Sequence, residues 1–110
     1  MAVGKLRMTP QTVAVLSVMI EEPDQAHYGL AIARATGLKT GTLHPILARL
    51  QEAGWTTSAW EDPEDHEDQG RPRRRYHRLT KDGELAARRA VAAASASGAR
   101  AALRPRTAQS

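Results

Sequence analysis

The chain has 110 residues, 41% of them hydrophobic, and a formal net charge of +4 at pH 7, which bounds it to one small domain. It has no Cys, which excludes disulfides and thiolate chemistry, and no Phe, so an aliphatic core is expected. No apolar stretch is long enough to cross a bilayer, and the N-terminus lacks the apolar segment of a signal peptide. We therefore expect a cytoplasmic protein.

The charges are unevenly distributed along the chain. Residues 61–68 hold six of the twelve acidic residues, whereas residues 71–81 hold six of the sixteen Lys and Arg and no acid. Outside the acidic segment the surface is expected to be basic, which is typical of a protein that binds a polyanion. On this pattern alone, a solvated arginine-rich face without a partner is an equally good interpretation.

The N-terminal third predicts an arm followed by a helix. Residues 1–7 are expected to form a flexible basic arm. Thr9 is a good N-cap and Pro10 suits the first helical position, so a helix is predicted from there to about Glu22, ahead of Pro23. Its apolar positions cover more than half of its circumference. Two sides of this helix therefore need covering, one by the domain core and one by a partner such as a helix of a second subunit.

The middle of the chain predicts two short helices joined by a turn. After a loop at 23–27, residues 28–36 predict a helix that ends at Gly37, and residues 40–53 predict a second one. Pro45 lies inside this second helix and predicts a tightened or irregular first turn. Apolar residues at spacings of three and four predict its core-facing side, namely Leu43, Ile46, Leu47 and Leu50.

The C-terminal half predicts a hairpin, a helix and a tail. Strands are predicted at 55–61 and 72–79, joined by the acidic loop 62–70 into a hairpin, the wing. A C-terminal helix is predicted over 80–95. Residues 96–110 lose apolar periodicity and gain Gly, Pro and Ser, so a disordered basic tail is expected there.

This order of elements predicts a winged helix-turn-helix over residues 8–79, an α+β, mainly α fold whose second motif helix is shaped to enter a DNA major groove. With its leucine stripe turned inward, the 40–53 helix presents its other side to solvent. The candidate DNA contacts are Lys39, Thr40, Thr42, His44, Pro45 and Arg49 there, and Arg73, Arg74 and Arg75 on the wing.

The segments HYGLAIARATGLKTGTLHPILARLQEAGW and GRPRRRYHRLTKDG, with a Trp-Glu pair ending the first strand, resemble the PadR family of transcriptional regulators. The resemblance covers roughly residues 8–90 and is to short members with a single C-terminal helix. It implies a sequence-specific repressor that binds a pseudo-palindromic operator as a homodimer. His44 stands where the family commonly has a DNA-contacting Tyr, so the operator preference does not transfer. The resemblance also implies dimerisation of the C-terminal helix on the N-terminal helix, with candidates Val15, Met19, Leu85 and Val91.

Other interpretations stay open. The acidic loop with His66 is a candidate metal site, as in a metal-responsive member of the family, although adjacent acids lack fixed geometry. Trp55, Trp60 and Tyr76 are candidates for the pocket of an unidentified small-molecule effector, although such residues more often anchor a wing. The module could also bind RNA or a protein partner, because fold does not fix function. We find no nucleophile elbow, phosphate-cradling loop or paired carboxylates, so we expect no enzyme and no cofactor.

Overall fold

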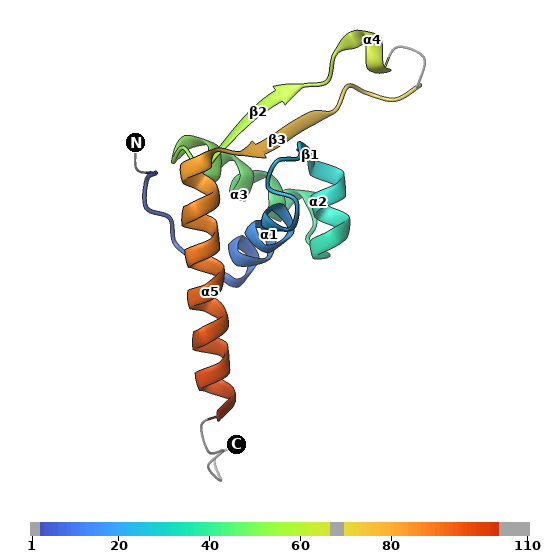
Figure 1. Ribbon diagram of the computed structural model, residues 1–110. Coiled ribbons are helices and arrows are strands. Elements are labelled where there is room, and N and C mark those ends of the chain that lie inside the picture. The colour runs from blue at the N-terminus through green and yellow to red at the C-terminus, as the bar shows by residue number, and fades with distance from the viewer. Residues whose placement is uncertain (1–2, 67–69, 104–110) are drawn as a thin grey trace.

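The computed structural model describes residues 3–66 and 70–103, with the backbone alone at 65–66 and 98–103. In chain order the elements are α1 (Pro10–Glu21), β1 (His27–Tyr28), α2 (Gly29–Thr36), α3 (Thr40–Glu52), β2 (Thr56–Trp60), α4 (Pro63–His66), β3 (Arg75–Leu79) and α5 (Lys81–Leu103). The strands form one antiparallel sheet in the order β1-β3-β2. The β2–β3 hairpin projects from the helices as the wing, and α5 packs against α1 and continues beyond it (Figure 1). The predicted winged helix-turn-helix is confirmed.

Local signals set the ends of the first two helices. Thr9 caps α1, because its Oγ1 accepts a hydrogen bond from the Thr12 N–H at 3.2 Å. Gly37 ends α2 in the left-handed conformation with φ 76°, which glycine adopts without strain, and its N–H donates to the Ala33 carbonyl at 2.8 Å. The tight turn between α2 and α3 follows from this glycine.

The core forms around one side of α3, as the spacing of its apolar residues predicts. Leu43 and Leu50 are fully buried and Ile46 and Leu47 nearly so, and they pack with apolar side chains of α1 and α2. The opposite side of α3 is exposed. The rotation of the helix is thus fixed by burial of its leucine stripe.

Pro45 lies within a continuous α3 and has no N–H to donate to the Gly41 carbonyl. The first turn is tight, because the Lys39 carbonyl accepts hydrogen bonds from both Thr42, at 3.0 Å, and Leu43, at 2.9 Å. The predicted tightening is present, although the helix still begins at Thr40 rather than later.

Trp55 connects the N-terminal arm, α3, β2 and α5. Its backbone N–H donates to the Leu50 carbonyl at 2.9 Å, and its carbonyl accepts from the Thr80 N–H at 3.0 Å. Its buried indole N–H donates to the Gly4 carbonyl at 2.7 Å. A Cβ added at Gly83 would lie 2.0 Å from the Trp55 carbonyl oxygen, so only glycine allows α5 to approach this closely.

The prediction that residues 1–7 form a flexible arm is wrong for residues 3–7. The Gly4 N–H donates to the Ala53 carbonyl at 2.8 Å, and Leu6 packs against the core. The buried indole of Trp55 needs an acceptor, and the arm supplies it.

The C-terminal helix is longer than the predicted 80–95. Because its alanine-rich sequence has high helix propensity, α5 continues to Leu103, so the part of the predicted tail at 96–103 is helical. Residues 104–110 of that tail lie outside the described residues.

Val15 and Met19, predicted at a dimer interface, are core residues. Each is 0% exposed within the single chain, because α2 and α5 already pack against α1. The prediction is wrong at these two positions, since neither side chain has surface to offer a partner. The other two candidates lie on α5, where Leu85 is 56% exposed and Val91 is partly buried.

The sheet also differs from the predicted hairpin. The loop predicted at 23–27 runs into β1, whose His27 pairs with His77 of β3, and a strand of two residues leaves no periodic pattern to detect. The two hairpin strands are shorter than 55–61 and 72–79, and part of the acidic loop forms the single turn α4.

Replacing Leu50 with Ala should lower the free energy of unfolding by about 2–5 kcal/mol, because the truncation leaves a cavity beneath α3. Urea denaturation followed by circular dichroism measures this change. Glu52→Ala, in the same helix but exposed, serves as the control and should change stability by less than about 0.5 kcal/mol. A near-neutral Leu50→Ala variant would contradict the rotation of α3 described above.

Candidate nucleic-acid interface

The exposed side of α3 is polar and cationic. The six residues predicted there are all exposed, namely Lys39, Thr40, Thr42, His44, Pro45 and Arg49. Ala48 and Gln51 on the same side are exposed as well. Thr40 and Thr42 lie in the first turn, where free backbone N–H groups carry the positive end of the helix dipole. This side of the helix is therefore accessible to an anionic partner.

Arg75 ties the wing to α3. Its Nε and Nη2 donate to the Ser58 Oγ at 3.2 and 2.9 Å, and Nη2 also lies 3.4 Å from the Gln51 Oε1. Ser58 in turn donates to the same Gln51 oxygen at 3.0 Å. The wing arginine nearest to α3 is consequently held in one orientation with respect to that helix.

Arg73 and Arg74 are restrained by different partners. Arg73 donates from Nε and Nη2 to the backbone carbonyl of Glu61 at 3.0 and 2.8 Å. The guanidinium carbon of Arg74 lies 4.2 Å from the centre of the Tyr28 ring, in a cation–π contact. Both charges remain without a carboxylate partner among the described residues.

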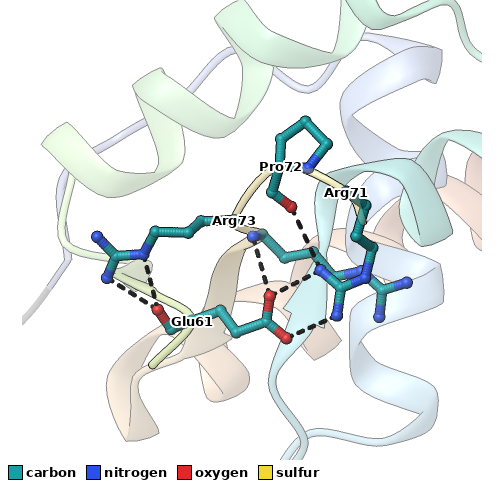
Figure 2. A network of polar contacts seen from close by, with 5 residues as sticks. Glu61, Arg71, Pro72 and Arg73 are labelled. Carbon is teal, nitrogen blue, oxygen red and sulfur yellow. Dashed lines mark hydrogen bonds and ion pairs between the residues drawn. The ribbon is translucent and has the colours of Figure 1, made fainter. Parts of the chain in front are cut away.

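Glu61 lies at the point where the wing strands diverge, and Figure 2 shows its contacts. Its carboxylate accepts two hydrogen bonds from the Arg71 guanidinium, at 2.7 and 2.9 Å, and a third from the Arg74 backbone N–H at 3.3 Å. The Arg71 fork is the main reason why the pKa of Glu61 falls from 4.5 to about 2, against the opposing effect of burial. The ion pair neutralises Arg71.

This ion pair was not predicted from the sequence, where Glu61 was counted among the acidic residues of 61–68 and placed at the end of the first wing strand. The Trp-Glu pair at the end of the first strand was the available signal. Ten residues separate the two partners, and only the hairpin register brings Arg71 back to Glu61.

A groove of about 520 Å³ separates α3 from the wing. His44, Ala48 and Gln51 line it from α3, and Trp60 and Arg75 line it from the wing. No lining residue is acidic. The groove therefore joins the exposed side of α3 to the wing arginines in one positively charged surface.

His77 lies in the wall of this groove and is buried. Burial lowers its pKa, and the positive charge of Arg75 adds to the effect, followed by His44. Within the described residues its Nδ1 has no hydrogen-bond partner. His77 is therefore neutral at physiological pH and adds no charge to the surface.

The three aromatic residues predicted to form an effector pocket do not meet. Trp55 is in the core, whereas Trp60 is 57% exposed in the groove. Tyr76 is on the other face of the hairpin, since Trp60 pairs with Arg75 and side chains alternate along a strand. It packs against Tyr28 with ring centres 6.0 Å apart. The three candidates for an effector pocket therefore do not line one shared pocket.

The side chain of His66, the candidate metal ligand of the acidic loop, lies outside the described residues. Among the residues whose side chains are described, no group of three or more His, Asp or Glu residues is arranged to hold a metal ion.

The model of the PadR-like transcriptional regulator family matches residues 15–89. The chain belongs to this family. No curated relative matches its sequence.

Solved regulators share the fold. The PcaV transcriptional regulator from Streptomyces coelicolor in complex with its natural ligand is 28% identical, with a TM-score of 0.65, over 97% of this chain and 68% of that one. The MarR family regulator SPO1453 from Silicibacter pomeroyi DSS-3 is 23% identical, with a TM-score of 0.60, over 87% of this chain and 62% of that one. Overoxidized AbfR bound to DNA is 24% identical, with a TM-score of 0.57, over 79% of this chain and 60% of that one. The last two show similarity of fold alone.

Family and fold together make this chain a DNA-binding transcriptional regulator with a winged helix-turn-helix. Its family and the matched structures are transcription regulators rather than enzymes. Within the described ranges, every helix is too short or too polar to pass through a lipid bilayer.

Arg71→Gln should raise the pKa of Glu61 from about 2 toward 4.5, because the fork that favours the carboxylate is removed. A ¹³C NMR titration of the Glu61 side chain measures this. In the wild type, the stability contributed by this carboxylate is complete above pH 4.5 and is lost as the pH falls toward 2. Glu61→Gln should abolish that part of the acid dependence in urea denaturation. A wild-type midpoint near 4.5 would contradict the role of the ion pair.

Proposed function

We propose that this regulator is a repressor that binds a pseudo-palindromic operator as a homodimer and reads each half-site with α3. The observation that carries the proposal is the exposed side of α3, which shares one groove, without acidic lining residues, with three wing arginines. Such a surface is complementary to duplex DNA in both shape and charge.

The residues on α3 suit contacts to base edges. Small side chains such as Thr42 and Ala48 let the helix approach the major groove closely, and His44 offers a donor and an acceptor to a base. Arg49, one turn further along, is long enough to reach a guanine or a phosphate. We propose that Lys39 and Thr40, at the N-terminus of α3, contact the backbone, and that Pro45 adds apolar surface.

The wing is proposed to hold backbone phosphates or the flanking minor groove. Because Arg71 is neutralised by Glu61, the charges available for this role are Arg73, Arg74 and Arg75. Their contacts with Glu61, Tyr28 and Ser58 reduce the entropy that ordering them on DNA would cost.

The homodimer is proposed to form through α5 and the start of α1. A hollow of about 580 Å³ between these helices is lined mainly by apolar side chains, including Met8, Val13 and Ala93. Leu85, on the same helix α5, is an exposed large apolar residue. A second subunit that packs in the hollow would bury its apolar lining and place two α3 helices on one duplex, about one helical turn apart. Repression would follow from occupation of promoter DNA.

Arg49→Ala should weaken binding to a selected duplex about tenfold or more, because one of the long reading side chains is lost. Fluorescence anisotropy with duplexes selected by the protein from a random library measures the affinity. Arg34→Ala removes the same charge from the exposed end of α2 and serves as the control, which should bind within about twofold of the wild type at physiological salt. Equal losses in the two variants, or tighter binding to structured RNA than to any duplex, would refute the proposed reading helix.

The wild type should sediment with twice the 12.0 kDa mass of one chain. Ala93→Glu should reduce this to a monomer, because a charge would be buried in the apolar hollow. Ala92→Glu is the matched control, since Ala92 is an exposed neighbour outside the hollow and its variant should remain dimeric. A dimeric Ala93→Glu protein would reject this interface.

A further inference from the structure

We propose that the groove between α3 and the wing holds one sugar–phosphate strand of the bound duplex, with Trp60 packed against a deoxyribose and Arg75 on the adjoining phosphate. This inference rests on the proposed function and deepens it, because it assigns a DNA contact to an aromatic residue outside the reading helix.

The exposure of Trp60 is the first argument. It is 57% exposed, although a tryptophan is the side chain with the most apolar surface to bury. Leu30, another of the exposed large apolar residues in the described part of the chain, lines the same groove from the start of α2. Apolar surface concentrated on two walls of one groove indicates a surface that is covered in a complex.

The charge around Trp60 is the second argument. The guanidinium carbons of Arg73 and Arg75 lie 6.0 and 5.6 Å from the centre of its ring, and no acidic residue lines the groove. A flat apolar ring between two cations matches a chain in which apolar sugars alternate with phosphates. Arg75 already uses Nε and Nη2 on Ser58 and Gln51, which leaves its Nη1 without a protein acceptor in the described residues.

Continuity with α3 selects the occupant. The α3 wall of the groove includes His44, Ala48 and Gln51, which belong to the exposed side proposed to read bases. A strand whose bases meet this side must carry its backbone past the groove, toward the wing. The same duplex can therefore fill both surfaces, without a second ligand.

Fluorine NMR on protein labelled with 5-fluorotryptophan tests the inference, because the chain has only two tryptophans and one of them is buried. The Trp60→Phe variant assigns the two resonances. Addition of a selected duplex should shift the Trp60 resonance and reduce its solvent isotope effect, whereas the Trp55 resonance should stay in place. Trp60→Ala should weaken duplex binding about tenfold, and Trp60→Phe, which keeps an aromatic ring, should recover most of the loss.

The outcomes separate this inference from the proposed function. A duplex that binds tightly while the Trp60 resonance stays unchanged would overturn the groove assignment and leave the repressor proposal intact. If the protein selects no duplex from the random library, the repressor proposal itself is rejected. A Trp60 shift with benzoate but none with duplex would identify a small-anion pocket instead, and would also overturn the assignment.

Discussion

The hydrogen bonds of Trp55 are the constraint on which the geometry of the proposed DNA-binding surface depends. Its backbone N–H donates to the end of α3, and its carbonyl accepts from Thr80 just before α5. Its indole N–H donates to the N-terminal arm. Because β2 begins at the next residue, the same junction sets the angle at which the wing leaves α3. The groove between α3 and the wing exists because these elements meet at one buried residue.

The wing arginines differ in whether they are paired with a carboxylate, and this difference sets the charge of the wing surface. Arg71 forms an ion pair with Glu61, and this ion pair lowers the pKa of the Glu61 carboxyl group. The Glu61–Arg71 ion pair joins the two sides of the hairpin beside the strand ends, and the following three arginines have defined contacts. The carboxylate of Glu61, although it belongs to an acidic segment, thus stabilises the arrangement of the neighbouring arginines.

Much of the fold was predictable from local signals, and so was the exposure of the candidate residues on α3. The cap at Thr9, the stop at Gly37 and the leucine stripe of α3 each depend on residues within one or two turns of each other, and these predictions are confirmed. Contacts between distant segments left no such pattern. The Glu61–Arg71 pair depends on hairpin register, and the burial of Met19 depends on how α2 and α5 pack on α1. The same limit explains why three aromatic residues predicted in one pocket lie in separate places.

The missing side chain at Gly83 has a mechanical consequence. Since α5 touches the Trp55 carbonyl directly, this helix and the winged domain must turn together as a rigid body. With 23 residues, α5 acts as a lever of roughly 35 Å. In the proposed dimer, a tilt of about 5° between the two α5 helices would displace the winged domains by roughly 3 Å, close to the rise of one base pair. If the proposed dimer forms, small changes at the contact between its two α5 helices would therefore alter the spacing of the two α3 helices.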